Sequence, residues 1–219
     1  MDKGMQQIII SGLGGQGVLF VTRLLAEAAL GMGLSVLISE THGMAQRGGN
    51  VISHLKVARG DGQTPLVSPL IRPGRADVLL ALHPEAMPVH GHYLSPEGFA
   101  FANSPGKPAR GSAVDATEIA CALDSPVSAN LVLLGFALAS GKLFCGIDRI
   151  ESVLKGHGGK RLEMSLRALD AGRRESRLQA APTPEPKLQA ASTAGLEAAP
   201  TSGRDAAPTS AAPDAAASR

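Results

Sequence analysis

The sequence predicts an α/β protein built on a single doubly wound, mostly parallel sheet, with a C-terminal helical part and a disordered tail. Short apolar runs alternate with longer segments whose apolar residues return every three or four positions, which is typical of strands alternating with helices. The first of these units contains a glycine-rich turn at residues 12–17. From Ala180 onward the composition changes to Ala, Pro, Ser and Thr, which favours neither kind of element.

The elements are expected in a regular order along the chain. A strand leads into the glycine turn, and the helix after it places Val18, Val21 and Leu25 on one face. The predicted strands cover residues 7–11, 34–40, 50–58 and 77–82, with weaker strands at 99–103 and 111–114. The predicted helices cover residues 16–30, 115–123, 129–140, 148–155 and 159–173.

One predicted helix, at residues 130–139, is apolar on nearly every side. Such a helix lies either in the centre of a domain or in a contact between subunits, and the sequence leaves both open. Ser125 and Pro126 before it suit an N-cap with proline at the first helical position.

We expect residues 1–175 to form one domain and residues 176–219 to be a disordered tail. The tail lacks the branched and aromatic side chains whose burial offsets the entropy of ordering, about 1–2 kcal/mol per residue for the backbone. It is either a solvated extension or a tether for a partner.

Charge and hydropathy exclude several classes of protein. A net charge of +2, 3% aromatic residues and the absence of Trp give little attraction for nucleic acid or an anionic membrane. The longest apolar run, at residues 131–139, is far shorter than the roughly 20 residues of a membrane span. Because the N-terminus also lacks the pattern of a signal peptide, we expect a cytoplasmic protein.

The cysteines and histidines predict no metal or cofactor held by this chain alone. Cys121 and Cys145 have no second cysteine at ligand spacing, and we expect both to be packed as small apolar residues. His90 and His92 resemble a metal-binding pair, but no Cys, Asp or Glu accompanies them at ligand spacing, so a surface loop is expected. His54, within a predicted strand, is expected to be a packed side chain with its polar atoms satisfied.

The glycine turn has the G-x-G-x-x-G spacing of dinucleotide-binding turns, in the strand–turn–helix order of a Rossmann-like fold. Glycine permits positive φ and close approach of the backbone, and the start of the following helix offers free N–H groups and a positive dipole end. Such a turn can hold an anion such as a phosphate. The predicted binding residues here are Gly12, Gly14, Gly15, Gln16 and Gly17.

A second glycine-rich segment follows the second predicted strand. In a nicotinamide or flavin enzyme, the acidic residue that closes this strand, Glu40, would bind the ribose. The residues after it, 41–49, are not typical of such a domain. The candidate binding residues of this segment are Glu40, Thr41, Gly43, Gly48 and Gly49, and the candidate catalytic residues are His42 and Arg47.

The two segments are expected to share one edge of the sheet, because ligands of parallel sheets bind beyond the carboxyl ends of the strands. Arg47 can form paired hydrogen bonds to a phosphate or carboxylate, and His42 can donate a hydrogen bond or transfer a proton near neutral pH. Either these loops complete an active-site pocket, or their glycines only permit close packing against another subunit.

Three stretches carry a more specific pattern: Gly-Leu-Gly-Gly-Gln-Gly-Val at 12–18, Glu-Thr-His-Gly-Met-Ala-Gln-Arg-Gly-Gly at 40–49, and Val-Ile-Ser-His at 51–54. Together they resemble the gamma domain of the 2-oxoacid:ferredoxin oxidoreductase family, and most of all its indolepyruvate ferredoxin oxidoreductase small (beta) subunits. Agreement extends to 76–80 and 130–135, so the resemblance covers roughly residues 7–172.

The resemblance implies one subunit of an enzyme of anaerobic metabolism that oxidatively decarboxylates an aryl pyruvate. Coenzyme A is the acyl acceptor and ferredoxin the electron acceptor. In this family the large (alpha) subunit carries thiamine diphosphate, which forms the carbanion, and iron–sulfur clusters, which remove the electrons. The resemblance therefore implies that the present chain is not active alone.

Three function classes are open at this point. The chain is the small subunit of such an oxidoreductase, an independent NAD(P)- or FAD-binding oxidoreductase that uses residues 12–17 and Glu40, or a non-catalytic scaffold for a large subunit. Dinucleotide affinity of the isolated chain would mark the second class. Loop substitutions that alter assembly but not rate would mark the third.

Overall fold

One sheet of six strands organises the part of the chain described by the computed structural model, which comprises residues 4–41, 49–60, 66–106, 108 and 110–180. The strand order is β2-β3-β1-β4-β5-β6. The strands are β1 (Met5–Leu13), β2 (Leu34–Thr41), β3 (Asn50–Arg59), β4 (Ala76–Ala81), β5 (Leu94–Asn103) and β6 (Ser112–Val114). The predicted α/β class, with a mostly parallel sheet, is confirmed.

The sheet is mixed because β3 runs against its two neighbours. β1, β4, β5 and β6 pair in parallel, whereas β3 is antiparallel to both β1 and β2. A Rossmann-like order would place β1 and β2 side by side, and β3 instead lies between them. The connection from β2 to β3 is too short for a parallel crossover, which needs a dozen or more residues, but it is long enough for a hairpin.

The helices lie close to the predicted positions, with one exception. They are α1 (Val18–Gly31), α2 (Ala86–His90), α3 (Ala116–Ala122), α4 (Ala129–Ala139), α5 (Ile147–His157) and α6 (Leu162–Ala180), with the 3-10 turns η1 (Gly91–Tyr93) and η2 (Pro126–Ser128). The exception is α2, which was not predicted: His90 lies in this helix and His92 in the 3-10 turn after it, where a surface loop was expected. α6 extends five residues beyond the expected domain boundary at 175. The rest of the predicted tail, residues 181–219, lies outside the described residues.

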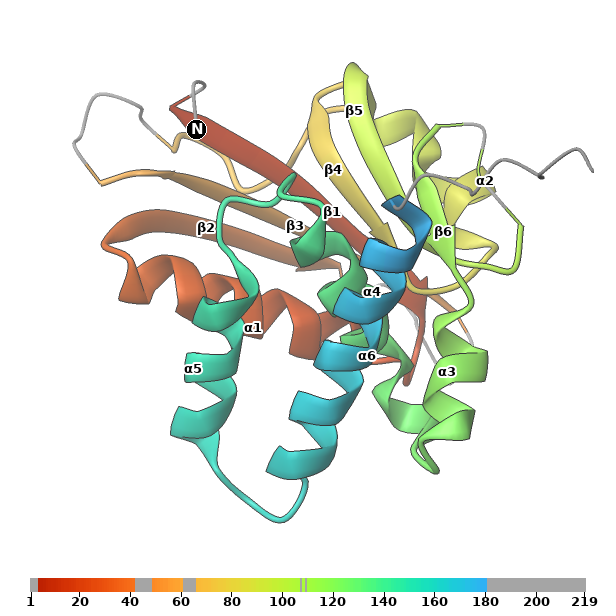
Figure 1. The fold of residues 1–219 in the computed structure, drawn as a ribbon. Coiled ribbons are helices and arrows are strands. Elements are labelled where there is room, and N and C mark those ends of the chain that lie inside the picture. Colours follow the sequence, from red (N-terminus) through yellow and green to blue (C-terminus); the bar gives the residue numbers. More distant parts are fainter. Residues whose placement is uncertain (1–3, 42–48, 61–65, 107, 109, 181–219) are drawn as a thin grey trace, which may run out of the picture. The chain divides into compact units, whose positions relative to one another are not determined.

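The two faces of the sheet are covered unequally. Five helices, α1 and α3–α6, bury one face against residues such as Ile8 and Ile10, and Figure 1 shows them gathered on that side of the strands. Ile9 points to the opposite face, where α2 and the segment around Ile71 complete a smaller apolar cluster. All three isoleucines are inaccessible to solvent, as expected for a strand buried on both faces.

α4 is a core helix, which decides between the two alternatives for the apolar segment. Every residue from Asn130 to Leu138 is buried within the chain itself. Its principal partner is α6, and the two helices approach closely at two glycines. A Cβ atom at Gly135 would collide with the carbonyl group of Leu169, and one at Gly172 would collide with that of Val132. The helices therefore touch backbone to backbone, which leaves no side of α4 free for a subunit contact.

The entry to α4 differs from the expected N-cap. Pro126 occupies the first position of the 3-10 turn η2, and α4 itself begins three residues later at Ala129. The Oγ of Ser125 bonds the Oγ of Ser128 at 2.8 Å and caps no backbone N–H. The chain thus reaches α4 through a short polar turn.

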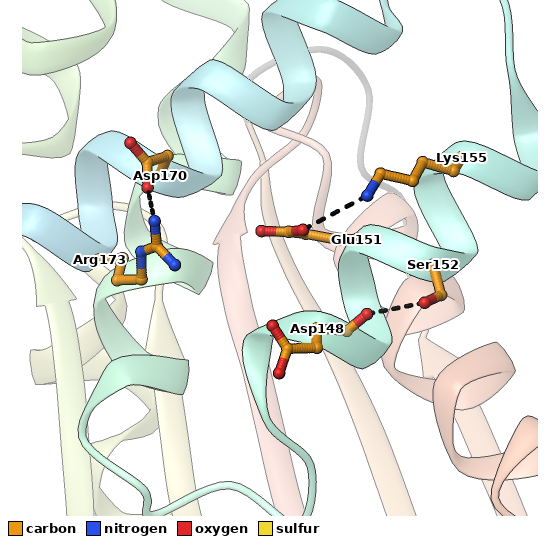
Figure 2. A network of polar contacts seen from close by, with 6 residues as sticks. All are labelled: Asp148, Glu151, Ser152, Lys155, Asp170 and Arg173. Carbon is orange, nitrogen blue, oxygen red and sulfur yellow. Dashed lines mark hydrogen bonds and ion pairs between the residues drawn. The ribbon is translucent and has the colours of Figure 1, made fainter.

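Ion pairs between residues of the same helix occur on both α5 and α6. Figure 2 shows Glu151 paired with Lys155 on α5, at 3.6 Å, and Asp170 paired with Arg173 on α6. Pairs of this kind at helix surfaces contribute about 0.3–0.5 kcal/mol each. They stabilise each helix locally, while Ile150 on α5 packs in the common apolar cluster with α6.

The close contact between α4 and α6 predicts that Gly172→Ala destabilises the protein. The added methyl group would lie 2.8 Å from the backbone nitrogen of Phe136 and closer still to the Val132 oxygen, so the helices must separate. We expect a loss of about 1–3 kcal/mol or more in the free energy of unfolding, measured with urea.

Gly156→Ala is the matched control for this substitution. Gly156 also lies in a helix, α5, but no atom stands within 4 Å of a Cβ there. We expect it to stabilise the protein by about 0.5–1 kcal/mol, because alanine loses less entropy than glycine in a helix. Equal effects of the two substitutions would contradict the packing described above.

Candidate functional site

The glycine turn connects β1 to α1 through two left-handed residues. Gly15 has φ of 96° and Gly17 has φ of 83°, a backbone region that side chains rarely adopt. The N–H of Gln16 donates to the carbonyl oxygen of Leu13 at 3.1 Å and closes the turn. The strand, turn and helix occur in the order that the sequence predicts.

Much of the hydrogen-bonding capacity of the turn is used within the protein. The side chain of Gln16 folds back over Gly12, and its Oε1 accepts the N–H of Leu13 at 2.8 Å. The N–H of Gly14 donates to the carbonyl oxygen of Gly49 at 2.9 Å. No hydrogen bond among the described residues uses the N–H of Gly15. The turn therefore offers an anion fewer amides than its sequence pattern indicates.

The second glycine-rich segment begins and ends at the same edge of the sheet as the turn. Thr41 pairs with Ile52 at the start of β3, and Gly49 contacts Gly14 directly. This juxtaposition arises from the β2–β3 hairpin, whereas the sequence analysis expected two parallel strands to bring the segments together. The residues between them, including His42, Gly43, Arg47 and Gly48, lie outside the described residues.

Glu40 is separated from the glycine turn by a whole strand. It lies on β2 opposite Ser53 of β3, and β3 in turn pairs with β1. Two strand spacings amount to about 10 Å. In a dinucleotide-binding sheet the acidic residue ends the strand next to β1. The position of Glu40 therefore departs from that arrangement.

A crevice of about 270 Å³ opens beside the turn, at the carboxyl ends of β1, β4 and β5. The chain continues from β1 to one side of the sheet and from β4 to the other, so this is the switch point where ligands of open α/β sheets bind. The lining residues are Gly15, Gln16, Leu82, Asn103, Thr117, Pro126, Val127, Ala129 and Asn130.

Two asparagines position the walls of this crevice, and the sequence analysis singled out neither of them. Asn103 donates to the carbonyl oxygen of Leu82 at 3.1 Å and to the hydroxyl of Thr117 at 2.9 Å. Asn130 donates to the carbonyl oxygen of Gln16 at 3.1 Å and lies against Gly17. The sequence does carry a signal for both, because each asparagine borders an apolar run: Asn103 follows residues 99–102 and Asn130 precedes residues 131–134.

Histidines lie close together on the face of the sheet that α2 covers, opposite α1 and α3–α6. His54 is 3% exposed, and its Nδ1 accepts the N–H of Ile71 at 3.2 Å, so the prediction of a packed, satisfied side chain is confirmed. His90 bonds the hydroxyl of Ser11 at 2.6 Å, and His92 contacts the ring of Tyr93. Burial lowers the pKa of His54 and of His90, which favours the neutral imidazoles in this cluster.

The two cysteines lie in different environments. Cys145 is buried, and burial raises its pKa to about 12. Cys121 is exposed, so the expectation that it is packed was wrong. It lies near the end of the short helix α3, whose buried face is formed by Ala116 and Ala120. Among the described residues, no three His, Cys, Asp or Glu side chains are grouped so that they could hold a metal ion.

Comparison with known proteins extends over most of the chain. A family model described as pyruvate ferredoxin/flavodoxin oxidoreductase matches residues 7–175. The indolepyruvate oxidoreductase subunit IorB of Archaeoglobus fulgidus is 30% identical over 191 residues, which cover 75% of this chain and 92% of that protein. The IorB of Pyrococcus horikoshii is 28% identical, over 75% of this chain and 93% of its own length.

Two solved structures share the fold. The gamma subunit of a keto/oxoacid ferredoxin oxidoreductase from Geobacter sulfurreducens has a TM-score of 0.63 and 24% identity, over 79% of this chain and 99% of that one. A 2-oxoglutarate:ferredoxin oxidoreductase from Magnetococcus marinus, with 2-oxoglutarate, coenzyme A and succinyl-CoA bound, has a TM-score of 0.66 and 21% identity. That match covers 80% of this chain and 32% of the other.

None of the helices in the described ranges is both long and apolar enough to cross a bilayer. This agrees with the hydropathy of the sequence.

The contact between Gly17 and Asn130 predicts different costs for two alanine substitutions in the turn. Gly15→Ala introduces only the cost of a left-handed side chain, about 1–2 kcal/mol, because nothing lies within 4 Å of a Cβ there. Gly17→Ala also collides with the side-chain amide of Asn130, so we expect an additional loss of about 1–3 kcal/mol. Urea unfolding measures both.

In an Asn130→Ala background the additional loss at Gly17 should disappear, because the colliding group is gone. If Gly17→Ala remains the costlier substitution in that background, Asn130 does not hold the turn as described.

Proposed function

The chain belongs to the pyruvate ferredoxin/flavodoxin oxidoreductase family, and on that basis we propose that it is the small subunit of an indolepyruvate-type 2-oxoacid:ferredoxin oxidoreductase. The observation that carries the proposal is the agreement with IorB over nearly the whole length of that subunit. The resemblance stated from the sequence is thereby confirmed. The proposed reaction is the oxidative decarboxylation of an aryl pyruvate to an acyl-CoA, with ferredoxin as electron acceptor.

The proposed complex divides the chemistry between two subunits. A large subunit holds thiamine diphosphate and iron–sulfur clusters, and the present chain joins it in the cytoplasm. Thiamine diphosphate supplies a carbanion equivalent at the substrate, and the clusters carry electrons away.

We propose that the edge carrying the two glycine-rich segments completes the active-site pocket of the complex. Coenzyme A, the acyl acceptor, is the group that this edge would bind. Its phosphates suit the guanidinium of Arg47 and the N–H of Gly15, which has no acceptor among the described residues. His42 is a candidate proton donor. The other proposed binding residues are Gly12, Gly14, Gln16, Gly17, Glu40, Thr41, Gly43, Gly48 and Gly49.

A scaffold role is the second candidate, and one observation favours it. The N–H groups of Leu13 and Gly14 are bonded to Gln16 and Gly49, which suits glycines that serve tight packing. An independent NAD(P)- or FAD-binding enzyme is less well supported, because β3 separates Glu40 from the turn. Kinetics distinguish the two roles, because loop substitutions would change the turnover of the complex if the loops form the site and would change only assembly if the chain is a scaffold.

Anaerobic purification of the tagged chain from its native cells tests the subunit proposal. We expect a large partner to co-purify, with bound iron and thiamine diphosphate, and the complex to reduce ferredoxin with an aryl pyruvate and coenzyme A. Mass spectrometry, metal analysis and the ferredoxin assay check this. A chain that purifies alone and binds a dinucleotide would overturn the proposal.

Arg47→Ala tests the site within the complex. We expect turnover to fall and the KM for coenzyme A to rise about ten-fold or more, because charge-assisted hydrogen bonds to phosphate are lost, while subunit association is unchanged. Arg174→Ala, on α6, is the control for loss of a surface guanidinium. If both variants have wild-type kinetics, Arg47 is not in the site; if Arg47→Ala weakens assembly alone, the scaffold role is favoured.

A further inference from the structure

A second and larger cavity, of about 600 Å³, lies next to the crevice. It is lined by residues of η2, the first turn of α4, the end of α5 and the start of α6, and by Phe20 of α1. Pro126, Val127 and Asn130 line both spaces, so η2 forms the wall between them. The volume of the larger cavity falls in the range of small-molecule sites, roughly 300–1,000 Å³.

Part of the cavity lining is apolar and includes an accessible aromatic ring. Leu131 and Leu154 are 2% and 4% exposed, and Leu162 extends this surface. Phe20 and Val127 also line the cavity, yet they remain 38% and 71% exposed. The described residues therefore leave an apolar surface, including a phenyl ring, accessible at this place, and a flat apolar group would bury it.

The lining also includes a cation, Arg161. Among the described residues, Arg161 forms no salt bridge, whereas His157 is paired with Glu27 at 2.5 Å. The hydroxyls of Ser125, Ser128 and Ser165 add hydrogen-bonding groups to the lining. A guanidinium beside hydroxyl groups suits a carboxylate, which it can bind through two hydrogen bonds.

Among the described residues that line the cavity, Asp124 is the one that carries a carboxylate. It opposes the accumulation of negative charge, so a monoanion suits this cavity better than a nucleotide or another polyanion. We propose that the cavity is a binding site for an aromatic monocarboxylate, with the ring against Phe20 and the apolar wall and the carboxylate on Arg161. This site is separate from the glycine-rich edge and is inferred from its lining alone.

Calorimetric titration of the full chain with phenylacetate tests the site. We expect saturable binding of one molecule per chain, binding of the neutral phenylacetamide at least about ten-fold weaker, and binding of the non-aromatic hexanoate also weaker. Arg161→Gln should weaken phenylacetate binding about ten-fold or more, whereas Lys160→Gln, its exposed neighbour outside the lining, should leave it unchanged.

Phe20→Ala provides a second variant that removes the ring but no charge. We expect it to weaken phenylacetate more than hexanoate. Absence of saturable binding, equal binding of acid and amide, or equal effects at Arg161 and Lys160 would each overturn the proposal. Because the titration needs no partner subunit and no turnover, its failure is distinguishable from a failure of the proposed function.

Discussion

The backbone contact between α4 and α6 is the constraint on which the rest of the structure depends. Gly135 and Gly172 remove the side chains that would otherwise hold the two helices apart. α4 can then lie fully buried between α6 and the sheet, and its first turn is brought to the carboxyl end of β1. There Asn130 bonds the backbone of Gln16 and contacts Gly17. The packing of two helices in the core thus sets the position of the glycine turn.

Most of the fold could be predicted from the sequence because its signals are local. The apolar runs and the helical periodicity located the principal elements to within a few residues, since each depends on which face of one segment is buried. The position of β3 could not be predicted in this way. Which strand pairs with β1 depends on contacts between segments that are far apart in the sequence. Here β2 and β3 form an antiparallel hairpin, and β3, not β2, pairs with β1.

The candidate site was only partly predictable for the same reason. Gly15 and Gly17 require left-handed backbone, which the motif indicates directly. The motif does not indicate which groups accept hydrogen bonds from the backbone N–H groups of the turn. The side chain of Gln16 folds onto its own turn, and the carbonyl of Gly49 comes from a distant segment, so both contacts require the tertiary arrangement. Asn130, more than a hundred positions away from the turn, is the extreme case.

The glycine fingerprint therefore means something different here from what its spacing alone indicates. In a dinucleotide site the turn must leave its amides free, and the acidic strand must lie beside β1. In this protein Gln16 and Gly49 occupy two amides, and β3 separates Glu40 from the turn. What the same glycines provide is a close approach between two loops at one sheet edge. A surface of that kind suits the proposed role, in which the chain completes a site together with a partner subunit.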